Sequence, residues 1–387
     1  MTPFFYYNGI MLSSLKNSVL AVSMLSGTII GVGFFSLPYI ASKTGIWIML
    51  GYFLVLGPLS ILIHSLFGKV ALATPDFFRF PSYVRIHLGS IAEKFAFVST
   101  IFGLFGAILA YLIVGGEFLT NLLSPIFGGG NFIYTILYFL SGALLIFFGV
   151  KAISKIEFWA VILFFLILVI FFIKGFPQIN LANLFPGVSL GNGILGIGDW
   201  FLPYGAILFS LSGASLIPEV EEILGQKKHL LNKVIIVSIL IAILIYLSFI
   251  FLVLGVSGSR TTESAITGLR GFLGNSIFNL GLFFGILTTF TSFIALGLNL
   301  KNVFRFDLKI KKHLSWAITC FVPLALFLAG IKQFIPVISF VGGILLGFDG
   351  ILILLMYKKI KPKSIFIYPL ALIFLGGIIY QIIYFSK

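Results

Sequence analysis

Charged residues are scarce in this sequence. Only 9% of its 387 residues are charged, whereas 60% are hydrophobic. A soluble protein of this size needs more charged side chains to cover its surface, so the composition excludes an ordinary soluble globular protein. It predicts an all-α polytopic membrane protein that is surrounded by the lipid bilayer.

Cysteine and acidic residues are rare as well. Cys320 is the single cysteine, which excludes an intramolecular disulfide framework. The 11 Asp and Glu residues are scattered, and no phosphate-binding loop, Ser-His-Asp set or pair of carboxylates lies in a water-exposed segment, so an enzyme is not expected. The net charge of +14 is not gathered in a basic domain, so nucleic acid is not an expected partner either.

Long apolar runs make up most of the chain. A membrane-spanning helix needs about 20 apolar residues. No cleavage site precedes the first run, which is expected to remain as a helix, and no linker could hold a soluble domain, so residues 1–387 are expected to form one transmembrane domain. Eleven spans are predicted, at residues 18–42, 46–73, 92–122, 131–150, 157–174, 196–224, 231–256, 275–301, 313–331, 335–357 and 364–385.

The basic residues indicate how these spans are oriented. If the N-terminus is cytoplasmic, 19 of the 25 Lys and Arg residues fall on the inner side and 6 on the outer side. Cytoplasmic loops of membrane proteins are enriched in Lys and Arg. The bias predicts a cytoplasmic N-terminus, an external C-terminus and an odd number of spans.

Two predicted spans are interrupted by helix-breaking residues. Span one contains GTIIGVGFFSLP (27–38) and span six contains FSLSGASLIPEV (209–220). In each span the interruption begins with Leu-Ser-Gly, at 25–27 and 211–213, and ends with a proline, Pro38 or Pro218. The two interruptions lie 186 residues apart, from Gly27 to Gly213, in spans of opposite orientation. This spacing predicts an inverted repeat of five plus five helices, at about 15–175 and 194–357, followed by an extra helix at about 364–385.

Unwound backbone inside a membrane has a physical cost that limits its use. Each unpaired group costs several kcal/mol in lipid, so a break persists only where it lines a cavity and meets a ligand. A half-helix N-terminus offers N–H groups and a positive dipole to a carboxylate, and a half-helix C-terminus offers carbonyls to an ammonium group or a cation. Two facing breaks could therefore bind a zwitterion. The alternative is that the glycines only allow close helix packing.

Three segments resemble a known family of transporters. GTIIGVGFFSLPY (27–39) resembles the first-helix signature of amino acid permeases of the amino acid–polyamine–organocation (APC) superfamily, which share the LeuT fold. LFSLSGASLIPEV (208–220) resembles the sixth helix of the amino acid/auxin permease group, and TTFTSFIALGLNLKNVF (288–304) the eighth helix of bacterial aromatic and hydroxy amino acid permeases. The resemblance implies a secondary active amino acid transporter in a prokaryotic plasma membrane, working by cation-coupled symport and alternating access.

The resemblance also implies a substrate site. The amides of Val32 and Gly33 would hold the carboxylate, carbonyls of both breaks would take the amino group, and other residues would line the space for the side chain. Tyr111 would cover the carboxylate, although packing between helices explains this tyrosine equally well. The implied substrate-binding residues are Thr28, Ile29, Val32, Gly33, Tyr111, Phe209, Ser210, Ser212, Gly213, Ala214 and Leu296.

A cation site follows from the same resemblance. The carbonyls of Gly27, Ile30 and Thr288 and the hydroxyls of Thr291 and Ser292 match the second sodium site of the LeuT fold, so Na⁺ is the expected coupling ion and no other cofactor is expected. Hydroxyls in membrane helices often bond their own backbone instead. Proton-coupled members of the superfamily often carry a lysine in span five, and this span has none before Lys174 at its outer end, which favours Na⁺. Similar bacterial aromatic permeases are proton symporters, so H⁺ is the alternative.

Several other features stay open at this stage. Glu117, Asp349 and His64 are ionisable groups in or near spans, where such groups are costly and often functional. Asp349 could be a proton site, a gate partner or the partner of Arg79 or Arg85, whereas the lone imidazole of His64 is a poor metal site.

The segment 259–274 is long enough for an external lid. A metal-ion transporter would want Asp, Asn or Met at the breaks, and a channel would not need the repeat; the sequence reveals neither the amino acid nor the oligomeric state.

Overall fold

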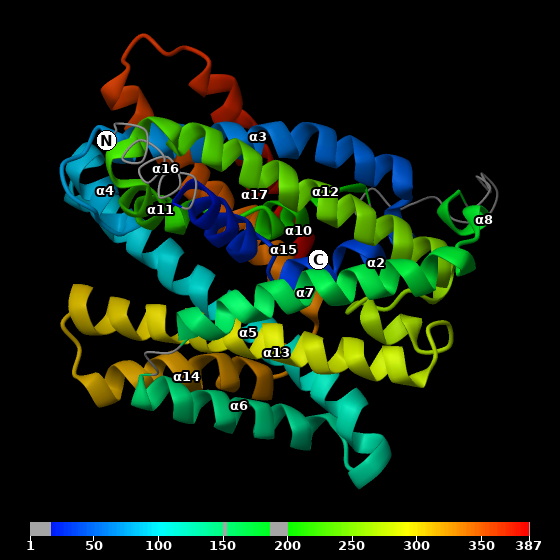
Figure 1. The fold of residues 1–387 in the computed structure, drawn as a ribbon. Helices are drawn as coiled ribbons and strands as arrows, with labels where there is room; N and C mark the ends of the chain where they lie inside the picture. Colours follow the sequence, from blue (N-terminus) through cyan, green and yellow to red (C-terminus); the bar gives the residue numbers. More distant parts are fainter. Residues whose placement is uncertain (1–16, 150–152, 186–199, 387) are drawn as a thin grey trace, which may run out of the picture.

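The computed structural model describes residues 17–149, 153–185 and 200–386, of which 153–162 and 164 are described by their backbone alone. Within these ranges every regular element is a helix (Figure 1). The main helices after the first, which covers Asn17–Ile29, are α2 (Leu37–Thr44), α3 (Ile46–Leu72), α4 (Phe80–Leu88), α5 (Ser90–Phe127), α6 (Asn131–Phe148), α7 (Ile153–Gly175), α8 (Leu181–Leu184), α10 (Leu202–Ser210), α11 (Ile217–Leu224), α12 (Leu231–Ser257), α13 (Asn275–Asn302), α14 (Lys312–Leu328), α15 (Phe334–Phe340), α16 (Gly347–Ile360) and α17 (Ile367–Phe385).

The number of spans differs from the expected eleven. Among the described residues, seven helical stretches are long and apolar enough to cross a membrane, and a bent pair in the first predicted span would be an eighth. One reason is that Leu202–Arg260 is a single stretch by this measure although it contains most of the predicted spans six and seven. Another is that predicted span nine is a shorter apolar helix, Lys312–Leu328, whereas predicted span five coincides with α7, whose side chains are described only in part. The eleven-span count and the five-plus-five repeat therefore stay predictions.

Large apolar side chains cover the outside of the helices. Trp47 and Leu54 on α3 are 71% and 78% exposed. In the most apolar 18-residue part of α17, only 17% of the residues are buried. A water-soluble monomer rarely exposes so much contiguous apolar surface, whereas lipid tails solvate it at no cost. The chain is a multi-pass membrane protein.

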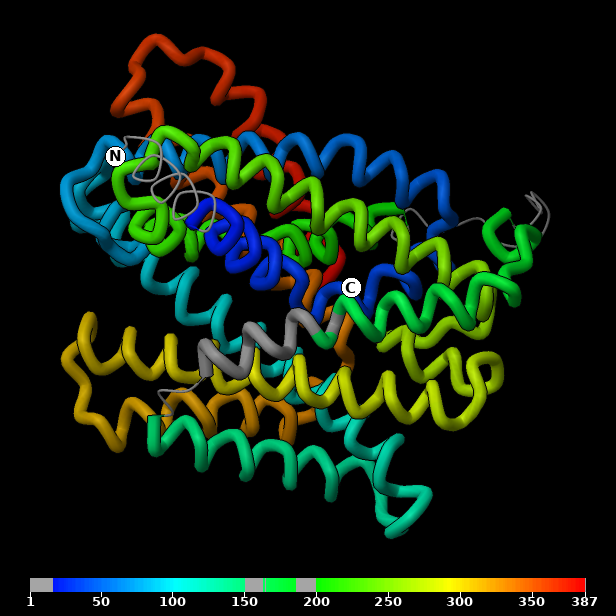
Figure 2. The backbone as a smooth tube through the Cα atoms, viewed as in Figure 1, coloured from blue at the N-terminus to red at the C-terminus, as the bar shows by residue number. Residues whose placement is uncertain are grey.

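The helices form two groups that are joined by a third set. α5, α6, α13 and α14 pack on one another, and α2, α3, α10, α11 and α12 form a second group (Figures 1 and 2). The continuous stretch Phe334–Ile360 contacts both, because α15 packs on α5 and α10 while α16 packs on α3 and α4. Two layers joined in this way can shift relative to each other without losing their internal packing.

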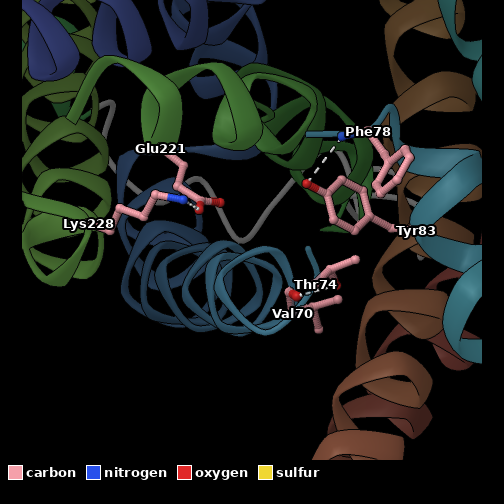
Figure 3. A network of polar contacts seen from close by, with 6 residues as sticks. All are labelled: Val70, Thr74, Phe78, Tyr83, Glu221 and Lys228. Carbon is pink, nitrogen blue, oxygen red and sulfur yellow. Dashed lines mark hydrogen bonds and ion pairs between the residues drawn. The ribbon is translucent and has the colours of Figure 1, made fainter. Parts of the chain in front are cut away.

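The loops that the charge pattern assigns to the cytoplasm meet at one end of the bundle. Arg79, before α4, forms an ion pair of 2.5 Å with Asp307, after α13. Glu221 on α11 is 3% exposed and pairs with Lys228 at 2.7 Å, and nearby Tyr83 accepts a bond from the Phe78 N–H (Figure 3). The Arg79–Asp307 pair joins the ends of predicted spans two and eight. The Lys228 ammonium lies 4.9 Å from the ring centroid of Phe77, which joins the segment after span six to the segment after span two.

The acid Asp349 does not use either arginine considered as its partner. Arg79 is paired with Asp307, and the nitrogen of Arg85 lies 3.8 Å from a carboxylate oxygen of Glu93. The predicted ion pair of Asp349 with Arg79 or Arg85 is therefore wrong. Its Oδ1 atom is buried and has no hydrogen-bond partner among the described residues.

The loops predicted to be external meet at the opposite end. Glu117 of α5 accepts hydrogen bonds from Ser264 at 2.7 Å and Thr267 at 3.2 Å, both within the segment 259–274. Burial raises the pKa of Glu263 in the same segment, and backbone N–H bonds from Phe334 and Ile335 oppose the shift. The expected lid is thus two short 3₁₀ helices, Gly258–Arg260 and Ile266–Leu269, anchored on α5 and α15.

Candidate functional site

The first predicted span is broken near its middle. Its helix ends at Ile29, and the chain resumes as a 3₁₀ helix over Val32–Phe35 and then as α2, with a bend of 54° between the halves. Gly31 between them is extended, with φ −98° and ψ −160°, and its N–H turns back to the Ile29 carbonyl at 2.8 Å. An extended residue cannot continue the i to i−4 ladder, so the backbone on both sides of it needs other partners.

The sixth predicted span repeats this arrangement. α10 ends at Ser210, a short 3₁₀ helix covers Ala214–Leu216, and α11 follows. In both spans the helix after the break has proline at its first or second position, where the missing N–H costs nothing. The chemistry of the two sequences thus produces the same order of helix, gap, 3₁₀ turn and proline-led helix.

The two breaks lie directly against each other. A Cβ added at Gly213 would lie 2.7 Å from a side-chain carbon of Ile29, and one added at Gly33 would meet Ser210, whose Cα would be 3.1 Å away. A Cβ on Gly33 would also come within 3.0 Å of the ring of Phe209. The structure therefore brings together six of the implied substrate residues: Ile29, Val32, Gly33, Phe209, Ser210 and Gly213.

Two tyrosine hydroxyls meet the unwound backbone. The Val32 N–H donates to the hydroxyl of Tyr111 on α5 at 3.1 Å, which joins the two helix groups at the break. The hydroxyl of Tyr246 on α12 lies 2.6 Å from the Ile29 carbonyl oxygen and 2.7 Å from that of Ser210. One hydroxyl proton can be donated to only one of these carbonyls at a time. The Ile29 carbonyl also accepts from the Gly31 N–H at 2.8 Å, so it keeps a donor when the hydroxyl proton is given to Ser210.

Helix α3 holds the sixth-span break from the other side. The hydroxyl of Ser60 donates to the Leu211 carbonyl at 3.2 Å, and the Gly213 N–H donates to Nε2 of His64 at 3.0 Å. Ser60 and His64 are four residues apart and so lie on one face of the helix. Each offers the partner that one exposed backbone group of the break requires.

A π-helical turn from a third span completes the surroundings. Residues Val341–Leu346 form a π-helix, and a Cβ on Gly342 would collide with the Gly205 carbonyl and lie 2.7 Å from the Phe209 nitrogen. Only glycine permits this approach. Single π turns of this kind occur often at functional sites because they free backbone groups from the regular ladder.

Some implied site residues are not joined to the breaks. Thr28 is exposed, Leu296 lies partly buried on α13, and no described hydrogen bond links either to the other break. For the cation set, the Thr291 hydroxyl donates to the Thr288 carbonyl at 3.0 Å, which is the local backbone bond considered as the alternative. The described hydrogen bonds do not connect Gly27 or Ile30 to α13.

The donor set nevertheless suits a hard cation. A hydroxyl that donates its proton keeps its lone pairs, and five neutral oxygens are the ligands that such ions prefer. Among the described residues no group of three or more His, Cys, Asp or Glu side chains could hold a metal ion.

Aromatic rings line the half of the first span that follows the break. Phe34 stacks on Phe249 with centroids 3.9 Å apart, and Phe35 meets Phe118 edge to face at 5.1 Å. A cavity of about 20 Å³ lies beside them, bordered also by Phe171 and Phe284 and without polar surface. The cavity has room for about one water molecule, so a larger ligand could enter only if the rings moved.

Three residues of the site were not assigned from the sequence. Tyr246 is the polar side chain nearest the middle of an otherwise apolar span, and Ser60 and His64 recur at helical spacing in another. The position of Tyr246 in its span and the four-residue spacing of Ser60 and His64 were both visible in the sequence. The backbone group that each side chain meets could not be predicted, because the contacts join residues 36 to 217 positions apart.

The comparisons with known proteins give a family for the chain. No curated protein matches it. Residues 15–374 match the tryptophan/tyrosine permease family. The matched region includes both breaks and the segment 288–304. A match over most of the 387 residues is too long to reflect a shared motif alone. The chain belongs to the tryptophan/tyrosine permease family, and it is an amino acid transporter rather than an enzyme.

Proposed function

We propose that this protein is a secondary active symporter that carries an aromatic amino acid across the plasma membrane of a prokaryote. It works by alternating access, with its N-terminus in the cytoplasm and its C-terminus outside. The eleven spans form a five-plus-five inverted repeat with one extra helix. The family match and the charge pattern of the loops support this proposal.

One observation carries the site assignment. The backbone groups of the two breaks face each other and are bonded to tyrosine hydroxyls, which are neutral groups that a ligand can replace. A substrate carboxylate can accept from the Val32 amide in place of Tyr111. A substrate ammonium has three donors and can satisfy the Ile29 and Ser210 carbonyls together, which the single proton of Tyr246 cannot.

The substrate class is proposed from the family and from the rings near the break. Phe34, Phe35 and Phe249 offer faces and edges on which an indole or phenol ring can pack. Gly213 and Ala214 leave the least side-chain volume at the sixth-span break. The Ser212 carbonyl is proposed to help hold the amino group, Leu296 to line the pocket for the substrate side chain, and Thr28 to belong to the site. Which aromatic amino acid is preferred depends on how the rings move when the pocket opens.

We propose Na⁺ as the coupling ion, held by the carbonyls of Gly27, Ile30 and Thr288 and the hydroxyls of Thr291 and Ser292. When bound, the ion would hold the first span against α13. The 7% exposure of Thr291 supports a site shielded from bulk water.

Proton coupling is the second candidate. It is favoured by Asp349, whose buried Oδ1 has no partner among the described residues and could take a proton at little cost.

Uptake into proteoliposomes tests the function and the ion together. The purified protein should accumulate labelled tryptophan or tyrosine when an inward Na⁺ gradient is imposed, and show exchange without any gradient. Accumulation in choline buffer that requires a pH gradient would replace Na⁺ by H⁺. The absence of both uptake and exchange for every amino acid would overturn the proposed function.

A further inference from the structure

His64 differs from the other histidines of the chain. Of the four, it alone is buried, with 6% of its surface exposed, and both of its ring nitrogens have partners. Nε2 accepts from the Gly213 N–H at 3.0 Å, and Nδ1 lies 2.7 Å from the Ser60 carbonyl oxygen. Neither neighbour is a charged group, so the ring serves the backbone alone.

These partners determine the protonation state of the ring. A nitrogen that accepts a hydrogen bond carries no proton, so Nε2 is bare, and Nδ1 must then hold the single proton of the neutral imidazole. That proton points at the Ser60 carbonyl, which accepts it. A second proton on Nε2 would set two N–H donors against each other across 3.0 Å. Protonation of His64 and its bond to Gly213 therefore exclude each other.

The Gly213 position matters because it lies at the contact between the breaks. Its backbone is close enough to Ile29 that a Cβ would lie 2.7 Å from that side chain. The Ile29 and Ser210 carbonyls on either side of this contact share the hydroxyl of Tyr246. A shift of Gly213 away from α3 would separate the two carbonyls that are proposed to take the substrate amino group.

No described hydrogen bond or ion pair joins His64 to a charged group. The described hydrogen bonds of His64 go only to Ser60 and Gly213. An unpaired charge inside a membrane protein is costly, so the imidazolium is disfavoured here. The titratable groups on α3 and on the elements packed against it are Lys43 and Tyr39 on α2, Tyr52 and Lys69 on α3, Tyr204 on α10, Glu219, Glu221 and Glu222 on α11, Lys233 and Tyr246 on α12, and Asp349, Tyr357, Lys358 and Lys359 on α16.

We propose that His64 is a positioning residue of the substrate site, which holds the sixth-span break in its binding form only while the imidazole is neutral. The inference rests on the proposed function, because it concerns the same pair of breaks. A proton reaching Nε2 when the site opens to water releases Gly213, and a bound amino acid in turn keeps the proton off. Binding of substrate and binding of this proton oppose each other by the same factor in both directions.

Binding of tryptophan and tyrosine to the purified protein by isothermal titration between pH 8 and pH 5 tests the inference. An ordinary imidazole titrates near pH 6.5, so the Kd of the wild type should rise roughly tenfold or more from pH 7.5 to pH 5. At pH 6 binding should release protons, seen as a dependence of the heat on the buffer. His64→Gln can accept from Gly213 and donate to Ser60 but cannot be charged. Its Kd should stay within about threefold of the wild-type value at pH 7.5 and should not change with pH.

Two matched variants separate positioning from general structure. His64→Ala should bind weakly at every pH, and His87→Gln, whose histidine meets only Thr74, should keep the wild-type pH profile. If the Gln variant fails to fold, the proton release of the wild type still decides. Wild-type binding without pH dependence or proton release, or a Gln variant with the wild-type profile, would overturn the role of His64 and leave the transport function standing. A wild type that binds and exchanges no amino acid would instead overturn the proposed function.

Discussion

The two broken spans are built alike but are held differently. At the first break, the Val32 amide is bonded to Tyr111 of α5, which belongs to the opposite helix group. At the sixth, the Leu211 carbonyl and the Gly213 amide are bonded to Ser60 and His64 of α3, which belongs to the same group as α10 and α11. The difference means that movement of one group against the other strains the first break directly, whereas the sixth break can move together with its supports.

The contact between the breaks is where the comparison can be tested most strongly. Gly33→Val places a branched side chain against Ser210 and Phe209 and holds any carboxylate away from the amides. Each charge-assisted hydrogen bond lost costs about 1.5–3 kcal/mol, so the loss of two should weaken tryptophan binding about 100-fold or more. Scintillation proximity binding measures this effect. Gly103→Val is the control, since nothing lies within 4 Å of a Cβ there, and unchanged affinity of the Gly33 variant would remove the site.

Hydroxyl removal compares the supports of the two breaks. Tyr246→Phe removes the hydroxyl that lies between the Ile29 and Ser210 carbonyls, of which only Ile29 keeps another donor, the Gly31 N–H, and Tyr111→Phe leaves the Val32 amide without this acceptor. A buried polar group left unsatisfied costs about 1–3 kcal/mol, and the first variant also loses the link between the two breaks, so it should lose more thermal stability in the absence of substrate. Because a substrate ammonium would take the place of the hydroxyl, the affinity for tryptophan should not fall. Tyr357→Phe keeps its ring for Lys69 and should match the wild type. Equal losses in both variants would mean that Tyr246 does not bridge the breaks.

The coupling ion gives a third and smaller effect, on the first break only. Thr291→Val keeps the shape of the side chain but removes one proposed Na⁺ ligand. The Na⁺ concentration for half-maximal uptake should rise about tenfold, while substrate affinity at saturating Na⁺ recovers, as linkage between two ligands requires. Thr289→Val is the matched control, because that hydroxyl bonds the Gly285 carbonyl on the same helix. A variant with wild-type Na⁺ dependence would contradict the site.

The smallest effect is expected where the two groups meet at the predicted cytoplasmic end. Arg79 and Asp307 are paired at 2.5 Å, but their side chains are 39% and 24% exposed. Pairs of this kind contribute about 0–1 kcal/mol, so Arg79→Gln should change the exchange rate of tyrosine by no more than about fivefold. Lys361→Gln, at an exposed loop position, is the control. A complete loss of exchange would show that the pair is a required gate.

Much of the architecture could be predicted because it depends on local chemistry. The apolar runs become helices, and the basic loops meet at one end of the bundle. Gly31, Pro38 and Pro218 end or begin helices where their backbone chemistry requires it. Predicted spans six and seven are separated by the turn Gly225–Leu230, where the sequence placed their boundary, whereas the total of eleven spans stays a prediction.

Composition, the spacing of apolar residues and the positions of glycine and proline thus determined by themselves that this is a helical membrane protein with two broken spans. The identity of the groups that hold the breaks was decided only by the tertiary structure. Tyr246, Ser60 and His64 reach backbone groups 36 to 217 residues away, and each needs a particular helix rotation and depth to do so. Rotation and depth are set by how whole helices pack, and no local pattern along the chain records them.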